Sequence, residues 1–443
     1  MIARAAALAA LAAAGVLLAT GAAAADAPAT PVANDPLPEA TPCPADLPAR
    51  TRCWAGRDAL GAWIRIAMPD NWNGVAVIHA HGGPELGAPR DARVLEDLER
   101  WKVMLKAGYL WAGTSYHQGG VAVLSAADDL DRLRRIVERI AGKPRRVIAH
   151  GQSWGASVAA RAAEQPGRWD GVLLTSGVLG GGTQSYDFRL DLRVVYQALC
   201  RNHPAPDEAA YPLWQGLPPR ATLTRTELAR RVDACTGIHH RVAERTPEQQ
   251  RRLDSILRVI RIREPSLEGH LSWATFEFRD IASRLGGGNA FGNEGVRYTG
   301  SDDDEALNRT VARYRRDPAA AAAFAADTDP TGRIDAPVLT LHAIDDPTAF
   351  VELESTFRDT MAAAGRADRL VQTYTDEHAH SYLADPEYVA AMGALLDWID
   401  HGDKPTPASV AARCRAAEPA FGGGCALRPD YVPAPLASRV PPR

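Results

Sequence analysis

The segment Gly151-Gln-Ser-Trp-Gly155 places a serine between two glycines, each separated from it by one residue. An apolar run over residues 146–150 favours a buried strand before this segment, and residues 154–165 follow with a helical pattern. A serine on a sharp turn between a strand and a helix has an exposed hydroxyl, and the free N–H groups of the helix can stabilise an oxyanion. The pattern therefore predicts that Ser153 is a nucleophile; the alternative is a glycine-rich turn with an inert serine.

A nucleophilic serine needs partners later in the chain. Its hydroxyl is weakly reactive at its ordinary pKa, so a base must accept its proton and a carboxylate must orient that base. Two aspartates, Asp345 and Asp346, follow an expected strand, and two histidines, His378 and His380, follow the next one. Serine, acid and histidine in this order predict a catalytic triad.

Two places supply backbone N–H groups for an oxyanion. One is Trp154, directly after the serine, and the other is the loop over residues 79–84, in which Gly83 would donate. Glycine there lets the backbone approach a substrate closely. His79 and His81 in the same loop would alternatively suggest a metal pair, but the sequence offers no third ligand, so no metal is predicted.

These residues need a scaffold, and the chain alternates apolar strands with amphipathic helices. Such alternation indicates a mostly parallel sheet that is covered on both faces. Functional residues of such sheets gather outside the carboxyl ends of the strands. The expected strands are Val75–Ala80, Tyr109–Ser115, Arg146–His150, Gly171–Ser176, Val338–Ala343 and Asp368–Thr375, and the expected helices are Ala126–Ile140, Trp154–Gln165, Phe350–Ala364 and Tyr388–Ile399.

The alternation stops near Gly180 and resumes at Val338, so one long segment interrupts the sheet. The segment is helical in most places, and long insertions in compact α/β domains usually cover an active site. We therefore predict a large, mainly helical cap. Four aromatic residues are expected to form the core of this cap, with an acyl or aromatic pocket as the alternative: Trp214, Trp273, Phe276 and Phe278.

The chain resembles the α/β-hydrolase superfamily, roughly from Trp54 to His401. The residues that carry the resemblance are His81-Gly-Gly-Pro84, Gly151-Gln-Ser-Trp-Gly155, Asp345-Asp346 and His380. The resemblance implies an α/β-hydrolase fold with an eight-stranded sheet, a Ser–Asp–His triad and no cofactor. Because this fold hosts many reactions, it does not by itself set the substrate.

The resemblance also favours one member of each candidate pair. In the superfamily a short apolar stretch after the acid starts the next helix, and this spacing implies Asp346 rather than Asp345. The other aspartate is then expected to cap that helix. The apolar support that follows the base implies His380 rather than His378. Asp345 and His378 stay as the alternatives.

The expected reaction is hydrolysis of a carboxylic ester, or of a related acyl bond, in a small molecule through an acyl-enzyme. The alternative is a serine aminopeptidase, because His-Gly-Gly-Pro resembles the oxyanion loop of proline iminopeptidases, although Glu85 replaces the glycine that usually follows. Such a peptidase needs acidic residues for the amino group of its substrate, and Glu85 and the acidic residues of the inserted segment are candidates. A third hypothesis is an α/β-hydrolase-like binding protein without turnover.

The first residues predict export. Arg4 precedes an apolar run, and small residues follow up to Ala25, which is typical of a cleaved signal peptide. The run is too short to favour a stable membrane anchor, so we expect a periplasmic or secreted protein. The expected parts are a signal peptide (1–25), a linker (26–48), the first part of the hydrolase core (49–183), the cap (184–334), the second part of the core (335–403) and a C-terminal tail (404–443).

The chain has six cysteines, all after the expected signal peptide, and an even number in an exported chain predicts three disulfides. The sequence does not select a pairing; near neighbours would give Cys43–Cys53, Cys200–Cys235 and Cys414–Cys425. The net charge is −4 and arginines are mixed with acidic residues, so no nucleic-acid partner is expected. The oligomeric state stays open.

Overall fold

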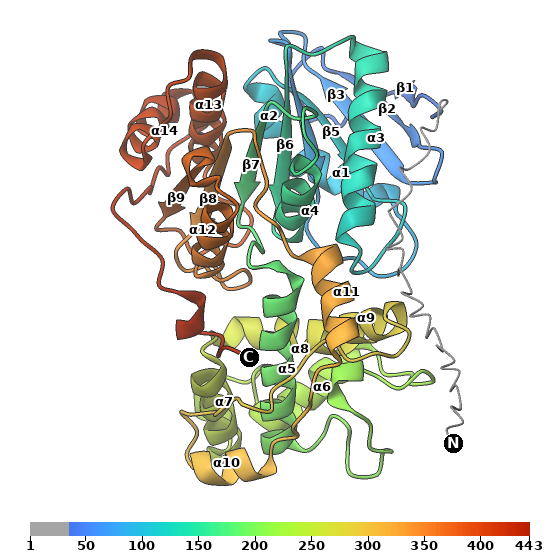
Figure 1. Cartoon of the computed structure of the whole chain (residues 1–443), viewed down its shortest axis with the longest axis vertical. Helices are drawn as coiled ribbons and strands as arrows, with labels where there is room; N and C mark the ends of the chain where they lie inside the picture. The colour runs from blue at the N-terminus through green and yellow to red at the C-terminus, as the bar shows by residue number, and fades with distance from the viewer. Residues whose placement is uncertain (1–34) are drawn as a thin grey trace, which may run out of the picture. The chain divides into compact units, whose positions relative to one another are not determined.

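A mostly parallel sheet of nine strands lies at the centre of the described chain (Figure 1). The computed structural model describes residues 35–443, of which Pro36–Arg443 form one unit. The predicted signal peptide (1–25) and residues 26–34 of the predicted linker lie outside the described residues. The strand order is β1-β2-β3-β5-β4-β6-β7-β8-β9. The strands are β1 (Glu39–Thr41), β2 (Arg52–Arg57), β3 (Trp63–Met68), β4 (Val75–Ala80), β5 (Leu110–Thr114), β6 (Arg146–Gln152), β7 (Gly171–Thr175), β8 (Val338–Ala343) and β9 (Leu370–Thr375).

The strands from β4 to β9 are parallel, whereas β1, β2 and β3 form antiparallel pairs at one edge and β3 pairs antiparallel with β5. Every residue of β4, β5, β7 and β8 is buried. Complete burial explains their continuous apolar sequences, because helices cover both faces of a parallel sheet.

The sheet has one strand more than the eight expected. The extra strand, β1, lies within residues 26–48, so the linker prediction was wrong for residues 39–41. Thr41 of β1 pairs with Cys53 of β2, and the disulfide Cys43–Cys53 joins the two segments just beyond this pair. A three-residue strand adds few hydrogen bonds of its own, and the crosslink holds it at the edge of the sheet.

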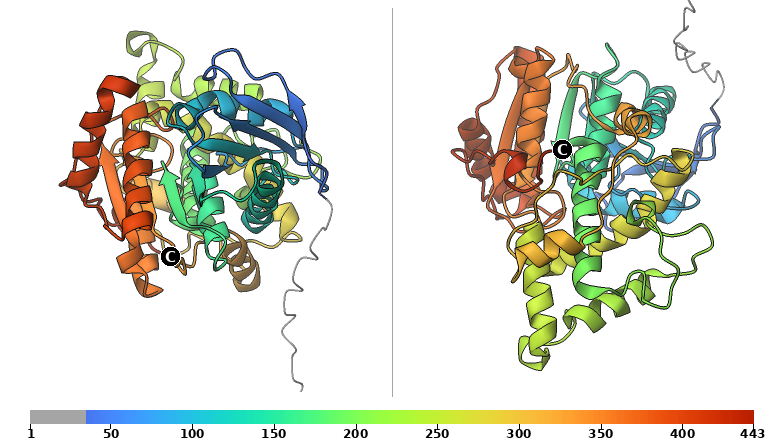
Figure 2. Two further views of the ribbon diagram at one scale, coloured as in Figure 1. Left: turned by 90° about the horizontal axis from the view of Figure 1, so that it is seen from above. Right: turned by 60° about the horizontal axis from the view of Figure 1, so that its bottom comes forward.

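Helices cover both faces of the sheet (Figure 2). Successive side chains of a strand point to opposite faces. Ile78 of β4 packs in one apolar cluster with α3, α4 and α12, and its neighbour Val77 packs in a second cluster with α1, α2, α13 and α14. These helices are α1 (Asp91–Arg100), α2 (Lys102–Lys106), α3 (Val123–Ala141), α4 (Trp154–Ala163), α12 (Leu353–Ala363), α13 (Asp385–His401) and α14 (Pro407–Phe421).

A group of helices between β7 and β8 lies beyond the carboxyl ends of the strands, in the lower half of Figure 1. These cap helices are α5 (Gly181–Cys200), α6 (Arg225–Thr236), α7 (Pro247–Ile260), α8 (Leu267–Ser272), α9 (Phe278–Arg284), α10 (Asp304–Thr310) and α11 (Pro318–Thr328). Tyr186 and Phe278 are buried in the cap, and Tyr186 also meets Trp154 at the edge of the core. Cap and core thus share one apolar cluster. The structure confirms the predicted fold class, an α/β-hydrolase fold.

Residues 404–443, predicted as a tail, contain a helix and fold back on the protein. Helix α14 begins with Thr406 as its cap, whose hydroxyl accepts from the Ser409 N–H, and with a proline in the first turn. Its apolar side packs against α13. The tail prediction was therefore wrong for this helix, because alanines gave it a weak amphipathic pattern in the sequence.

The chain after α14 connects the core to the cap. Leu436 donates its N–H to Ser355 of α12 at 3.1 Å, and Arg443 pairs with Asp191 of α5 at 2.7 Å. Arg443 also lies 3.6 Å from Asp187, one turn earlier in the same helix. The last residues of the described chain thus contact both parts of the fold.

The three disulfides have the near-neighbour pairing proposed from the sequence: Cys43–Cys53, Cys200–Cys235 and Cys414–Cys425. Disulfides persist in oxidising compartments, so they indicate an extracellular or periplasmic location. Within residues 35–443, none of the helices combines the length and apolar character needed to cross a bilayer.

Glu387, at the start of α13, is fully buried and holds the end of the sheet. One carboxyl oxygen accepts from the Thr375 hydroxyl at 2.7 Å and from the Ala426 N–H at 2.9 Å. Burial, with Glu377 nearby, raises the pKa of the Glu387 carboxyl to about 7. The folded protein therefore keeps a proton that the unfolded chain loses above about pH 4.5, and this group makes stability fall as the pH rises towards 7.

We expect Glu387→Gln to leave stability nearly unchanged at pH 5 and to raise it at pH 8, on the order of 1–3 kcal/mol, because the amide avoids burying a charge. Urea unfolding of the wild type and the variant at both pH values measures this difference. An equal change in the free energy of unfolding at pH 5 and pH 8 would contradict the assignment.

Candidate active site

Ser153 lies on a strained turn between β6 and α4. Its backbone has φ +58° and ψ −124°, a left-handed conformation that residues other than glycine rarely adopt. Its N–H donates to the Thr175 carbonyl at 3.0 Å, and its carbonyl accepts from the Val178 N–H at 3.1 Å. These bonds to the end of β7 hold the turn, so the hydroxyl points away from the sheet at the carboxyl ends of the strands.

The two glycines of the motif are required by close packing. A Cβ atom on Gly151 would lie 2.3 Å from the Gly155 carbonyl oxygen, and one on Gly155 would lie 2.1 Å from the Ala80 carbonyl oxygen. Both distances are far shorter than a van der Waals contact. Glycine therefore lets α4 start directly against β6 and β4.

The structure brings Ser153, His380 and Asp346 together in one hydrogen-bonded chain. His380 lies in the loop between β9 and α13, and its Nε2 is 2.8 Å from the Ser153 Oγ. Its Nδ1 is 2.9 and 2.8 Å from the two carboxylate oxygens of Asp346, which follows β8. With Nδ1–H donating to the carboxylate, Nε2 can accept the hydroxyl proton.

Asp346 also organises its own loop. Its Oδ1 accepts from the N–H groups of Thr348 and Ala349 at 2.8 and 2.9 Å, and its side chain is fully buried. The prediction that the other aspartate would cap this segment was wrong. A short carboxylate can bond the backbone two residues ahead and still face a histidine, so one residue serves both purposes.

The alternative residues Asp345 and His378 form a separate pair on the surface. His378 Nδ1 is 2.9 Å from Asp345 Oδ2, and the two side chains are 67% and 53% exposed. Within the described residues 35–443, neither Asp345 nor His378 forms a hydrogen bond with Ser153. The structure therefore places this pair outside the hydrogen-bonded chain.

Trp154 directly follows Ser153, and the loop that carries Gly83 approaches the serine through Gly82. Trp154 is the first residue of α4, where backbone N–H groups have no partner within the helix. In the loop after β4, a Cβ atom on Gly82 would lie 3.2 Å from the Ser153 Cβ, so the backbone leading to Gly83 lies against the serine. The role of Trp154 and Gly83 as oxyanion donors stays a prediction.

The two histidines of this loop contact different neighbours. His79 Nδ1 lies 2.9 Å from His150 Nδ1 in the buried interior, and His81 stacks on Tyr116. Across residues 35–443 the acidic, histidine and cysteine side chains form no cluster suited to a metal ion.

His342 lies behind Asp346 and was not expected from the sequence. Its Nδ1 is 3.0 Å from Glu354 Oε1, and its Nε2 is 2.8 Å from the Ala349 carbonyl and 3.6 Å from Asp346 Oδ2. Burial alone would lower the pKa of His342, but Glu354 and Asp346 raise it above its usual value. The buried ring thus lies between the carboxylates of Glu354 and Asp346.

Two other residues that sequence analysis missed support the loop of His380. Arg100, at the end of α1, donates through Nε to the Ser381 carbonyl at 3.0 Å, and Gln152 donates to the Ser381 hydroxyl at 2.7 Å. Gln152 could have been found, because it lies within the serine motif. Arg100 gave no signal, since a basic residue in the last turn of a helix is ordinary.

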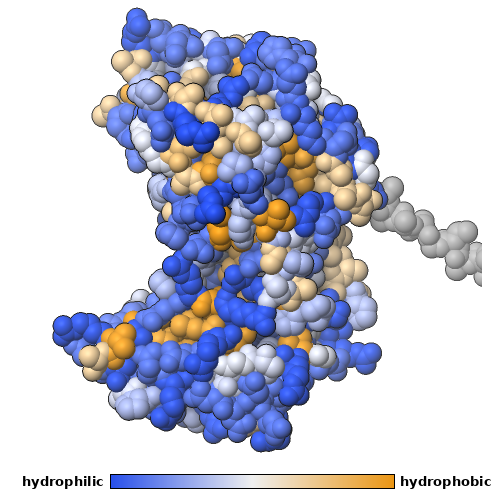
Figure 3. All heavy atoms as spheres, turned by 90° about the vertical axis from the view of Figure 1, so that its left-hand side faces the viewer, coloured by the Kyte–Doolittle hydropathy of each residue, from blue (hydrophilic) through white to orange (hydrophobic). Residues whose placement is uncertain are grey.

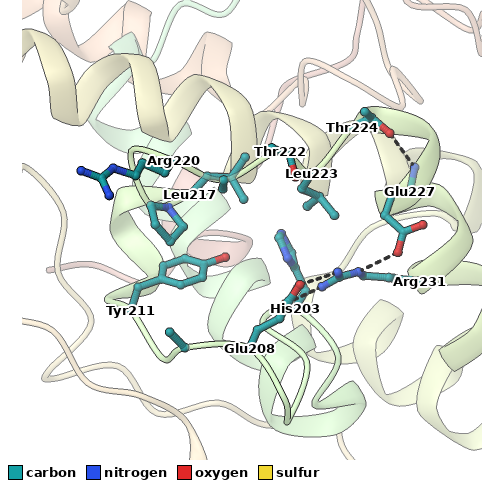
Figure 4. A pocket seen from close by; sticks show the side chains of 13 residues that line it. His203, Glu208, Tyr211, Leu217, Arg220, Thr222, Leu223, Thr224, Glu227 and Arg231 are labelled. Carbon is teal, nitrogen blue, oxygen red and sulfur yellow. Dashed lines mark hydrogen bonds and ion pairs between the residues drawn. The ribbon is translucent and has the colours of Figure 1, made fainter.

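The surface view in Figure 3 shows a hollow at the level between the sheet and the cap, with apolar side chains in it. A different pocket lies wholly within the cap (Figure 4), where Arg231 bridges Glu208 and Glu227. This pocket contains no residue of the hydrogen-bonded chain. Its lining residues are His203, Glu208, Ala209, Tyr211, Leu217, Pro218, Arg220, Ala221, Thr222, Leu223, Thr224, Glu227 and Arg231.

Comparison with known proteins gives similarity in structure only. No family model matches the chain, and no curated protein does. Feruloyl esterase B from Aspergillus oryzae is 12% identical with a TM-score of 0.42, covering 84% of this chain and 86% of its own. An esterase of Pyrococcus furiosus is 14% identical with a TM-score of 0.42 (82% and 97% covered), and an acylaminoacyl peptidase of Pyrococcus horikoshii is 11% identical with a TM-score of 0.35 (75% and 38% covered). These similarities do not identify the reaction of this protein.

The two aspartates provide a matched test of the geometry. We expect Asp346→Asn to slow the labelling of Ser153 by a fluorophosphonate at least ~10³-fold, because an amide does not hold His380 in the required tautomer. Asp345→Asn is expected to stay within about threefold of the wild type, because an exposed ion pair contributes little. The labelling rate constants of the three proteins decide between the aspartates, and a larger loss in Asp345→Asn would refute the choice of Asp346.

Proposed function

We propose that this protein is an exported serine hydrolase that cleaves a carboxylic ester of a small molecule. The observation that carries the proposal is the chain of hydrogen bonds from Ser153 through His380 to Asp346, with distances of 2.8 Å at each side of the imidazole. These hydrogen bonds align an alcohol, an imidazole and a buried carboxylate for transfer of the hydroxyl proton. The disulfides support the export that the N-terminal sequence predicts.

The proposed reaction has two halves. His380 Nε2 takes the proton of Ser153 while Oγ attacks the ester carbonyl, and the N–H groups of Trp154 and Gly83 bind the oxyanion. When the tetrahedral intermediate collapses, His380 gives this proton to the leaving alcohol and an acyl-serine remains. His380 then deprotonates a water molecule that attacks the acyl group, and Ser153 regains its proton as the acid leaves. Asp346 keeps its negative charge and stabilises the imidazolium in both halves.

The aminopeptidase alternative has less support. It requires a carboxylate available to the ammonium group of a peptide, and the candidates were Glu85 and the acidic residues of the inserted segment. The Glu85 carboxylate instead lies 2.8 Å from Arg90 and 3.6 Å from Arg93. Two guanidinium groups already satisfy its charge, so this residue does not favour a substrate ammonium group.

We expect Ser153→Ala to abolish both fluorophosphonate labelling and hydrolysis of p-nitrophenyl butyrate, with kcat at least ~10⁴-fold below the wild type. The exposed serine of α9 provides the control, and Ser283→Ala should retain both properties. Aminoacyl p-nitroanilides measured beside the ester test the alternative reaction. Faster turnover of the anilides, or labelling of a residue other than Ser153, would overturn the proposal.

A further inference from the structure

A small cavity adjoins the hydrogen-bonded chain on the side of the cap. Its lining includes Val178 from the segment after β7, Thr348 and Phe350 from the loop of Asp346, and Arg189 and His270 from the cap. The chain after α14 contributes one further lining residue, Val440.

Two of these lining residues contact the proposed catalytic residues through their backbones. The Val178 N–H donates to the Ser153 carbonyl at 3.1 Å, and the Thr348 N–H donates to the Asp346 carboxylate at 2.8 Å. The cavity is therefore built on the same two turns that carry the proposed nucleophile and acid. A group bound in it would therefore lie beside both turns.

Arg189 brings a buried positive charge to this cavity. The residue is only 8% exposed, and its guanidinium lies 4.7 Å from the Tyr186 ring and 4.8 Å from the Trp273 ring. Nη1 donates to the Ser185 carbonyl one turn earlier in α5, and Nε has no acceptor. Trp273, expected in the core of the cap or in a pocket, thus packs over the cation beside the cavity.

No carboxylate of residues 35–443 forms an ion pair with Arg189. Glu277 acts on it only at longer range, and this carboxylate pairs with Arg225 at 3.1 Å. A buried cation without a counter-ion is costly, because one carbonyl and two aromatic rings replace only part of its hydration. Such an arrangement is expected where a ligand supplies the missing anion.

His270 is the second polar group of the cavity. It is 1% exposed, and its ring lies between Phe188 and Phe350, with centroid distances of 5.2 and 5.5 Å. The Pro347 backbone lies near the ring, but neither ring nitrogen has a partner with hydrogen-bonding geometry in the described residues. Burial lowers the pKa of His270 well below its usual value, so the neutral ring offers one N–H donor.

We propose that this cavity is a subsite for a carboxylate carried by the substrate, which Arg189 binds by charge and His270 by a hydrogen bond. The inference rests on the proposed function and narrows it to esters that also carry an anionic carboxylate, such as half-esters of dicarboxylic acids. Phe188 and Phe350 flank the cavity, so the part of the substrate between the ester and the carboxylate is apolar. A guanidinium matches a planar carboxylate in shape and charge.

The first experiment compares two substrates that differ in the carboxylate. Mono-4-nitrophenyl glutarate carries it, and 4-nitrophenyl pentanoate does not. We expect the kcat/KM of the wild type to be at least tenfold higher for the glutarate than for the pentanoate. We expect Arg189→Met to reduce the ratio of these two kcat/KM values at least tenfold. A higher kcat/KM of the wild type for the pentanoate than for the glutarate would overturn the proposal. A folded Arg189→Met protein with the wild-type ratio of the two kcat/KM values would overturn it as well.

Arg193 provides a matched control on the same helix. It is also buried, but its guanidinium is bonded to the His203 carbonyl and to the Tyr211 hydroxyl, away from the cavity. We expect Arg193→Met to keep the wild-type ratio of the two kcat/KM values. A ratio that falls equally in both variants would show general damage to the cap and would count against a specific role for Arg189.

A binding measurement separates this inference from the proposed reaction. Ser153→Ala protein is titrated calorimetrically with monomethyl glutarate, and the titration is repeated with Ser153→Ala/Arg189→Met. We expect the second substitution to weaken binding at least tenfold, and equal binding overturns the subsite. If the fluorophosphonate does not label Ser153 in the wild type, the proposed reaction fails, while this titration still decides whether the cavity binds a carboxylate.

Discussion

The position of the Ser153 hydroxyl depends on how closely helix α4 approaches strand β4. At Gly155 the helix leaves no room for even one methyl group beside the Ala80 carbonyl. A helix that starts so close to the sheet forces the preceding residue into a conformation with positive φ. The hydrogen bonds of Ser153 to Thr175 and Val178 oppose relaxation of this strain. The scaffold therefore imposes the conformation that the serine would not adopt alone.

A second constraint acts through charge. Asp346 is buried, and a buried carboxylate is tolerated only if hydrogen-bond donors surround it. Two backbone N–H groups and the ring of His380 supply these bonds, and His342 with Glu354 lies behind them. The proposed acid is thus one member of a buried polar network that spans β8, α12 and the loop after β9. Such networks fix one arrangement of side chains, because any member left unpaired is costly.

The sequence contained enough information for the central strands and for the serine turn. Strand β4 was predicted with the bounds that the structure has, because complete burial makes its sequence continuously apolar. Strands β2 and β3 were missed, since strands near the antiparallel edge mix buried with polar residues, as in Trp63-Ile-Arg-Ile-Ala-Met68. Alternation of Ile64 and Ile66 around Arg65 was the available signal for β3.

The surroundings of the candidate site were harder to predict than its central residues. Arg100 reaches Ser381 across 281 positions of sequence, and only the folded chain shows that this arginine differs from those on the surface. Arg189 poses the same difficulty, because burial without a counter-ion leaves no trace in a helical sequence pattern. The choice of Asp346 over Asp345 depended on spacing, whereas its two backbone bonds arise from the turn itself.

The contact of Arg443 with helix α5 has a mechanical consequence. Its guanidinium is held by two buried carboxylates of the cap, while Leu436 is anchored to α12 in the core. If the cap moved away from the core as a rigid body, the Arg443 guanidinium would separate from Asp187 and Asp191. Part of the negative charge of these two buried carboxylates would then have no nearby positive charge. Large movements of the cap away from the core are therefore resisted electrostatically by the last residue of the described chain.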